Sequence, residues 1–233
     1  MKRLTKAGHS IKATSKEFRV SKSTVYYHTK DSCRKMTTFH VGLLNETEKG
    51  YIIGLFTGDG SFNRGCKEPR FFVRFTLDAK RDRDIASRIA QIIGKAGKRI
   101  SLISWKSNII AKTCSKALVA YIQSYVDYKQ GEKKLLNSKN WSDGFRYGFV
   151  AGIIDSDGHV HAHLGTEIKT VSSKNFESVS SILGDLEISA TARVRDAPDN
   201  SYSKKPRYII YIPSSEMKRI KERIPSAKVA RYL

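Results

Sequence analysis

Residues 51–60 read YIIGLFTGDG and residues 149–158 read FVAGIIDSDG, which is one pattern written twice at an offset of 98 residues. Small residues recur in it at four-residue spacing, and on a helix such residues line up in one strip. They are Gly54 and Gly58 in the first copy, and Gly148, Gly152 and Ser156 in the second. Glycine inside a helix costs about 1 kcal/mol relative to alanine, so the strips need a packing reason. We expect two helices that pack closely around a pseudo-twofold axis.

The same order of patterns follows each stretch. Alternating apolar residues predict strands over 71–77, 99–105 and 109–113 in the first copy, and over 159–164, 167–171, 192–195 and 208–212 in the second. A 3.6-residue period predicts the helices between them. Each copy is therefore expected to run helix, two strands, helix, two strands, helix. We predict an α+β fold with an internal duplication: a basic extension over 1–45, a first repeat over 46–128, a polar linker over 129–144 and a second repeat over 145–233.

An aspartate stands near the end of each predicted central helix, followed by a glycine that suits the helix C-terminus. These residues are Asp59 and Asp157. A carboxylate there is repelled by the helix dipole, and two carboxylates brought together repel each other as well. A hard divalent cation, Mg²⁺ first, would relieve both effects. In a basic protein this arrangement suggests phosphodiester hydrolysis. The alternative is a pair of ordinary surface aspartates, which the repetition makes less attractive.

Residues 52–60 and 150–158, IIGLFTGDG and VAGIIDSDG, resemble the two signature helices of the single-chain LAGLIDADG homing endonucleases. The resemblance covers roughly residues 46–225. It implies two αββαββα repeats related by a pseudo-twofold axis, with a saddle of antiparallel strands in the DNA major groove. It also implies that Asp59 and Asp157 hold Mg²⁺, for which Mn²⁺ or Ca²⁺ can substitute in binding, together with the carbonyls of Gly58 and Ser156. Cleavage of both DNA strands with short 3′ overhangs would follow.

Family members often carry a Gln or Lys near the end of the second strand that supports the attacking water. The corresponding places here hold roughly Leu77-Asp78 and Ser172-Ser173. Lys112 is the candidate for the lysine role in the first half, and its counterpart in the second half is not basic. His159 or His161 is a candidate assistant in that half. The two halves are therefore expected to differ.

Basic and polar residues alternate with apolar ones along the predicted strands, so that one face suits a core and the other suits DNA. Arginine can pair bidentately with guanine, which makes Arg99, Arg193 and Arg195 the leading base readers. The alternative for each is a solvated charge at a sheet edge. The predicted strand contacts to DNA are Arg70, Arg74, Arg99, Ser101, His159, His161, Lys169, Arg193, Arg195 and Arg207.

Residues 11–28 resemble a helix-turn-helix in which Ile11 and Phe18 face inward and Ser21 caps a recognition helix. The alternative is a basic helical extension that touches phosphates. The predicted DNA contacts of that helix are Lys22, Ser23, Thr24 and Tyr27.

The composition agrees with a polyanionic partner. The chain has 233 residues, with 43 Lys and Arg against 22 Asp and Glu, for a formal charge of +21 spread over all its parts. Nucleic acid is the leading partner for such a chain. No apolar run approaches a membrane span, no secretory signal is present, and the three cysteines form no CxxC pair. We expect an intracellular, intron-encoded monomer with free thiols.

Two other functions remain open from the sequence. A protein of the same fold could bind nucleic acid without cutting, as an intron RNA maturase or a helix-turn-helix transcription regulator. A simple helix-turn-helix factor with a ligand-sensing domain is also possible, although it leaves the duplicated glycine strips unexplained. Retention of both Asp59 and Asp157 favours the nuclease.

Overall fold

The computed structural model describes residues 11–29, 38–62, 71–129, 132–161, 163–196 and 206–232. The chain separates into two compact units, Met1–Thr38 and Phe39–Leu233. No helix among the described residues has the length and apolar character needed to cross a membrane.

The first unit contains two short helices, α2 (Ile11–Glu17) and α3 (Lys22–Thr29). Arg19 has a φ of 51° in the turn between them, and the Ser21 hydroxyl accepts a hydrogen bond from the Thr24 amide, as expected of a cap. Val25 is fully buried. The expectation that Phe18 faces inward is wrong, because 43% of its surface is exposed. Residues 18–21 form the turn, which turns this side chain away from the small core.

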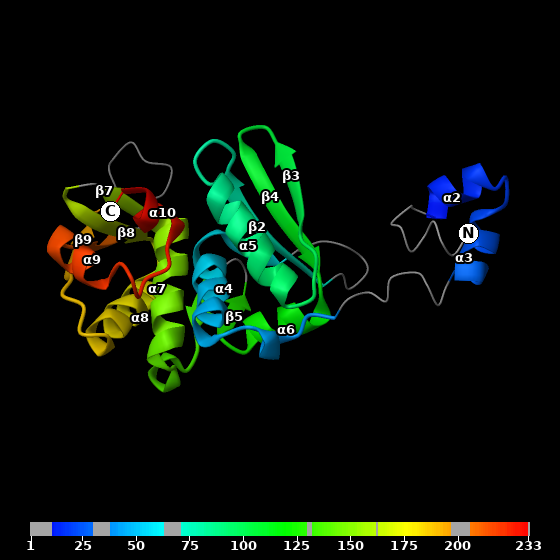
Figure 1. Cartoon of the computed structure of the whole chain (residues 1–233). Helices are drawn as coiled ribbons and strands as arrows, with labels where there is room; N and C mark the ends of the chain where they lie inside the picture. Colours follow the sequence, from blue (N-terminus) through cyan, green and yellow to red (C-terminus); the bar gives the residue numbers. More distant parts are fainter. Residues whose placement is uncertain are drawn as a thin grey trace. The chain divides into compact units, whose positions relative to one another are not determined.

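The second unit has the predicted duplicated α+β architecture (Figure 1). Its first repeat comprises α4 (Glu46–Asp59), β1 (Gly60–Phe62), β2 (Phe72–Asp78), α5 (Arg83–Lys95), β3 (Ser101–Trp105), β4 (Asn108–Cys114) and α6 (Lys116–Gln123). The second comprises α7 (Asp143–Asp157), β7 (Gly158–His161), β8 (Gly165–Thr170), α8 (Ser173–Asp185), β9 (Thr191–Arg195), β10 (Arg207–Ile212) and α9 (Ser214–Ile220). Each repeat forms one antiparallel sheet, in the orders β1-β2-β4-β3 and β7-β8-β10-β9.

Helices α4 and α7 pack against each other between the two sheets (Figure 1). Their contact is so close that a Cβ atom on Gly54 would lie 2.1 Å from the Phe149 carbonyl oxygen, and one on Gly152 would lie 2.5 Å from the Leu55 amide nitrogen. Gly50, which was not among the predicted strip residues, is equally close to the Phe145 carbonyl oxygen. The small-residue strips thus serve the packing role that was predicted for them.

Several elements lie outside the predicted repeat pattern. Residues 126–135, which overlap the predicted linker, form a hairpin of β5 (Val126–Lys129) and β6 (Glu132–Leu135). Short 3-10 helices occupy Val41–Leu43 and Ser138–Asn140. At the C-terminal end, α10 (Ala227–Tyr232) packs on α7 and β7. The hairpin and α10 each bring a lysine to the ends of the central helices.

Candidate active site and nucleic-acid interface

The central helices begin with side-chain caps and end at the two predicted aspartates. Asn45 and Glu48 form a capping box at the start of α4, and the Ser142 hydroxyl caps α7. Gly60 and Gly158 follow the aspartates in extended conformation and lead directly into β1 and β7. Glycine is required there for space, because a Cβ atom would lie 2.3 Å from the Phe56 ring at Gly60 and 2.5 Å from the Ile154 carbonyl oxygen at Gly158.

Asp59 and Asp157 are half-buried and interact electrostatically. Burial, and next the negative charge of Asp157, raise the pKa of the Asp59 carboxyl from 3.8 to about 7, and Asp82 adds a smaller effect in the same direction. Burial also raises the pKa of Asp157. A pair of carboxyl groups that shares one region in this way resists carrying two negative charges unless a cation is close.

Two lysines place positive charge beside the pair. Lys133, on β6, donates hydrogen bonds to the carbonyl oxygens of Thr57 at 3.0 Å and Gly58 at 2.6 Å. Lys228, on α10, donates to the carbonyl oxygens of Ser156 at 3.2 Å and Gly158 at 3.0 Å. Both ammonium groups lower the pKa values of both aspartates, opposing the effect of burial. Burial in turn lowers the pKa of Lys133 to about 8.

The donor set suits a hard divalent cation. It consists of two carboxylates and the carbonyls of Gly58 and Ser156, all oxygen ligands of the kind that Mg²⁺ prefers. The lysine ammonium groups bind these same two carbonyls, which shows that the ends of both helices attract positive charge. No group of three or more His, Cys, Asp or Glu side chains among the described residues could hold a metal ion, so a metal here would rely on carbonyl and water ligands besides the two acids.

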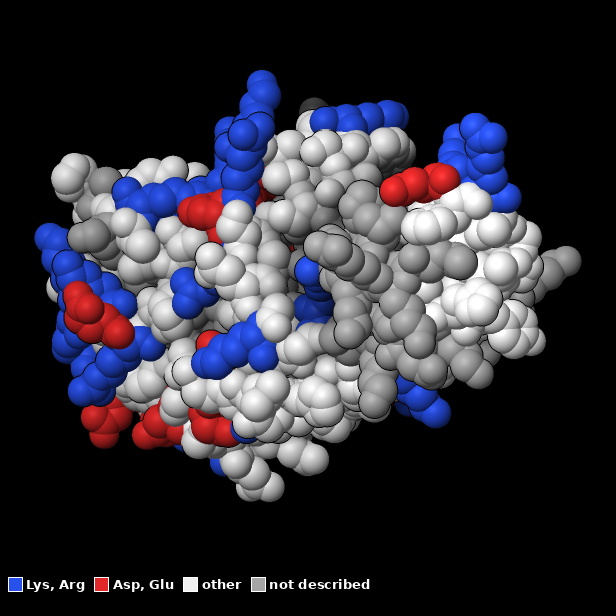
Figure 2. All heavy atoms as spheres, turned by 45° about the vertical axis from the view of Figure 1, so that its right-hand side comes forward, with Lys and Arg blue, Asp and Glu red and all other residues white. Residues whose placement is uncertain are grey.

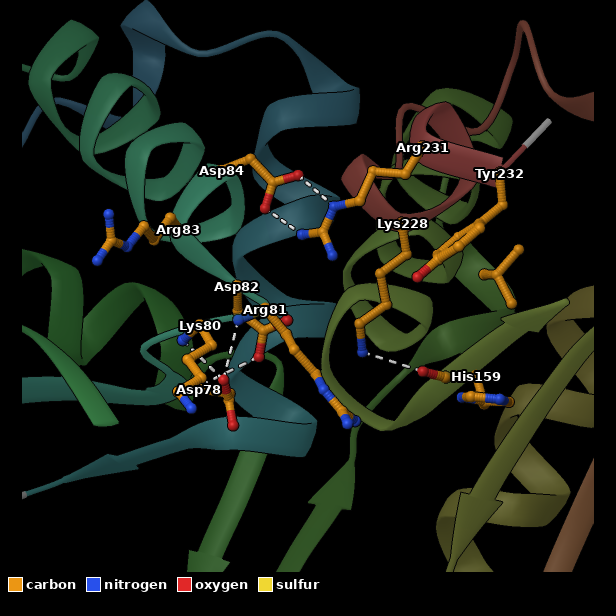
Figure 3. Close-up of a pocket in the computed structure, with 12 residues that line it drawn as sticks. Asp78, Lys80, Arg81, Asp82, Arg83, Asp84, His159, Lys228, Arg231 and Tyr232 are labelled. Atoms are coloured by element: carbon orange, nitrogen blue, oxygen red, sulfur yellow. Dashed lines mark hydrogen bonds and ion pairs between the residues drawn. The ribbon is translucent and has the colours of Figure 1, made fainter. Parts of the chain in front are cut away.

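Two cavities lie beside the ends of the central helices, and Asp157 lines the second of them. One, of about 870 Å³, lies between the loop 78–84 of the first repeat and Gly158, His159 and Lys228 of the second (Figure 3). The other, of about 810 Å³, lies between Thr57, Gly58 and Lys133 on one side and residues 169–175 with Arg207 on the other. Each cavity therefore joins the end of one central helix, and its lysine, to a loop of the opposite repeat.

Lys112 lies on β4, where it pairs with Arg74 of β2 and Ser101 of β3, and its ammonium group sits 4.2 Å from the Phe72 ring centroid. It lines neither of the two cavities. The lysines that bind the carbonyls at the helix ends are Lys133 and Lys228, which were not among the predicted site residues. Lys133 lies in the predicted linker and Lys228 lies near the C-terminus, and neither belongs to a motif. Only the tertiary structure brings them to the helix ends.

In the second sheet, the strand register places the predicted DNA contacts on one face. Lys169 and Arg193 both pair with Ile209, and Arg195 pairs with Arg207. His159 pairs with Glu167 on the same face, and His161 lies two residues further along β7. The opposite face carries the buried residues Ile168, Ile210 and Ile212.

The first sheet has a matching polar row. Ser61, Arg74, Lys112 and Ser101 pair in turn across its strands, and Arg74 Nε donates to Ser61 Oγ at 3.3 Å. The burial of Val73, Phe75 and Leu77 on the other face confirms the predicted alternation of β2. Arg99 precedes β3 and is exposed. Arg70 lies outside the described residues.

On α3 of the first unit, Lys22, Ser23 and Tyr27 are exposed and Thr24 is half-buried. Tyr27 has 72% of its surface exposed and meets the ring of Tyr26 edge to face.

Figure 2 shows Lys and Arg side chains recurring across one face of the molecule, with fewer Asp and Glu side chains between them.

Comparisons with known proteins support the predicted resemblance. Residues 144–225 match the family model described as LAGLIDADG-like domain. No curated protein sequence matches the chain. The structure of I-DmoI in complex with DNA and Mn is similar with a TM-score of 0.58 and 17% identity, covering 78% of this chain and 98% of that one. Mesophilic variants of the homing endonuclease I-DmoI give a TM-score of 0.58 and 16% identity, covering 79% and 98%.

The N-terminal LAGLIDADG domain of DUF199/WhiA is similar as well, with a TM-score of 0.53 and 16% identity over 80% of this chain and 86% of that chain. At such identities the likeness establishes the fold. The chain carries a LAGLIDADG-like domain over residues 144–225, and its core has the two-repeat LAGLIDADG fold.

Proposed function

We propose that this chain is a site-specific double-strand DNA endonuclease that uses divalent metal. The observation that carries the proposal is the pairing of Asp59 and Asp157 at adjacent helix ends, with one lysine ammonium group beside each helix end. This arrangement concentrates oxygen ligands and positive charge at one place, flanked by two cavities. A phosphate group of bound DNA would meet both there.

The polar faces of the two sheets are the proposed DNA-binding surface. Arginines and lysines on these faces would contact phosphates and guanine edges, and α3 of the first unit would contact DNA through Lys22, Ser23, Thr24 and Tyr27. Both repeats lie in one chain, so a monomer holds both acids, and we propose that it acts as one. I-DmoI, which shares the fold, has been crystallised with DNA and Mn.

In the proposed reaction Asp59 and Asp157 hold Mg²⁺ together with the carbonyls of Gly58 and Ser156. The metal would supply an activated water and stabilise the leaving oxygen. Lys133 and Lys228, each lining one of the two cavities, would stabilise negative charge on the phosphate and orient the attacking water. We call the end of α4 with Lys133 one centre and the end of α7 with Lys228 the other; the two centres would each serve one DNA strand, so that both strands are cut and short 3′ overhangs remain.

Cleavage of a plasmid library that carries randomised target sites, in Mg²⁺, tests the proposal. We expect cutting by the wild type and none by Asp59→Asn or Asp157→Asn. Asp143→Asn is the matched control, because Asp143 is an exposed residue at the other end of α7. Undiminished cutting by both active-site variants would show that the site is elsewhere. Binding without cutting across Mg²⁺, Mn²⁺ and targets would favour a non-cleaving regulator or, if intron RNA is bound, a maturase.

A further inference from the structure

The residue two positions before the terminal aspartate of each central helix differs between the repeats, and the two side chains make different contacts. In the first repeat this residue is Thr57, whose hydroxyl donates to the Ile53 carbonyl oxygen within its own helix. In the second repeat it is Asp155, which is fully buried. Asp155 reaches out of its helix and binds the segment that carries Lys228.

Four donors converge on the two oxygens of the Asp155 carboxylate. Oδ1 accepts from the Ser226 hydroxyl at 2.6 Å and from the Lys228 amide at 3.0 Å. Oδ2 accepts from the Tyr51 hydroxyl at 2.8 Å and from the Ala227 amide at 2.9 Å. An asparagine could not replace this residue, because in either amide orientation its NH₂ group would face a backbone N–H.

The segment held in this way is the one that presents Lys228. The backbone amide of Lys228 is bound to Asp155, and the Lys228 side chain extends to the carbonyls of Ser156 and Gly158, one and three residues after Asp155. Figure 3 shows the Lys228 side chain reaching from α10 toward the backbone beside His159. A second contact fixes the other end of α10, since Arg231 Nε donates to the Asp84 carboxylate on α5 at 2.6 Å. The Asp84 side chain in this ion pair is exposed to solvent, whereas the Asp155 side chain is fully buried.

Lys133 reaches the other centre by a different route. It stands on the β5–β6 hairpin, with its ammonium group 5.4 Å from the Phe56 ring centroid. None of the hydrogen bonds of Asp155 described above involves that hairpin. Loss of the Asp155 carboxylate should therefore disturb one of the two centres.

We propose that Asp155 is a positioning residue that seats the C-terminal segment and thereby places Lys228 at the end of α7, where it binds the Ser156 and Gly158 carbonyls, so that only one of the two strand cleavages depends on it. This inference rests on the proposed nuclease function. Its consequence is that Asp155→Asn converts the protein toward a strand-specific nicking enzyme, although Asp155 holds neither metal nor DNA.

Strand-resolved cleavage tests the assignment. The substrate is a duplex recovered from the cleaved library, with a different label on each strand, and the readout is the ratio of the two cutting rates. We expect Asp155→Asn to slow cleavage of one strand at least tenfold more than cleavage of the other. The strand affected should be the one whose cleavage Lys228→Met slows. The double variant should be little slower than Lys228→Met alone. Asp143→Asn, the same substitution elsewhere on α7, should leave the ratio unchanged.

A general loss of stability would slow both strands alike, so equal slowing by Asp155→Asn would overturn the assignment. A second measurement does not depend on activity. Amine acetylation of the full chain, followed by mass spectrometry, should show faster modification of Lys228 in Asp155→Asn than in the wild type, with Lys133 unchanged. Unchanged acetylation of Lys228 would also overturn the inference. If the wild type cuts no DNA, the proposed function fails, and the acetylation result still decides whether Asp155 seats Lys228.

Discussion

Lys133 on β6 donates a hydrogen bond of 2.6 Å to the carbonyl oxygen of Gly58, the residue that precedes Asp59. The two residues are 75 positions apart, and the hairpin that carries Lys133 overlaps a segment whose polarity suggests a simple linker. This contact brings the Lys133 ammonium group to the end of α4, where the Gly58 carbonyl and the Asp59 carboxylate lie.

Lys133→Met should slow DNA cleavage by about 100-fold while leaving target binding within a factor of a few, because removal of a group that assists proton transfer or charge stabilisation costs roughly 10²–10⁴ in rate. Single-turnover cleavage and gel-shift binding measure the two effects. Lys134→Met is the control, since Lys134 is the exposed neighbour on the same strand. Equal slowing by both variants would indicate a loss of overall charge and not of a specific contact.

In the absence of metal, Asp59→Asn should stabilise the protein at pH 8. The pKa of Asp59 is raised from 3.8 to about 7, so the folded state binds this proton more tightly than the unfolded state. The stability of the wild type should therefore fall as pH rises from about 4 to about 7, and the variant should lose this part of the dependence. We expect a gain of about 2–4 °C in melting temperature, the shift that 1 kcal/mol produces in a domain of this size. A lower melting temperature of Asp59→Asn than of the wild type at pH 8 would contradict the predicted repulsion between Asp59 and Asp157.

Mg²⁺ should raise the melting temperature of the wild type more at pH 8 than at pH 6. Protons compete with the metal for carboxylates whose pKa values are raised, so metal affinity should weaken as pH falls through about 7. Thermal denaturation with and without Mg²⁺ at the two pH values measures the effect. The Asp59→Asn/Asp157→Asn double variant should show no Mg²⁺ response at either pH. A response that persists in it would place the metal elsewhere.

Gly54→Ala should destabilise the core by about 1–3 kcal/mol or more, because the added methyl group meets backbone of α7 that cannot move aside. The unfolding free energy from urea denaturation measures this cost. Gly94→Ala is a matched control, since Gly94 also lies in a helix but has no atom within 4 Å of an added Cβ. That variant should be neutral or more stable by up to about 1 kcal/mol, the difference in helix propensity.

Arg193→Ala should weaken binding to the selected target by about 1–3 kcal/mol and relax the preference for guanine at one position of the site. A phosphate contact would instead weaken binding to all sequences alike and reduce the salt dependence of affinity. Binding to a panel of single-base variants of the target at two salt concentrations separates the two outcomes. Lys218→Ala is the control, because it also removes one exposed positive charge. Lys218 lies on α9, the helix that packs against β8, and not on a strand of the proposed DNA-binding surface.

The sequence predicted most of the fold because its decisive signals are local or repeated. The four-residue spacing of Gly54 and Gly58 fixes one face of α4, and the alternation in β2 separates buried Val73 and Phe75 from exposed Arg74. Both patterns follow from backbone geometry alone. Phe18 shows where such local reasoning fails, because its exposure depends on how the turn at Arg19 bends the chain.

The sequence by itself determined the duplicated repeats, the packing of α4 against α7 and the position of Asp59 and Asp157 at the helix ends. Each of these follows from side-chain size or periodicity within one segment and its copy. Only the tertiary structure decided that Lys133 and Lys228 lie at the ends of the central helices, and that Asp155 binds the segment carrying Lys228. These contacts join segments some 70 residues apart, and they exist because buried carbonyl and carboxylate oxygens need donors that only the folded chain can bring to them.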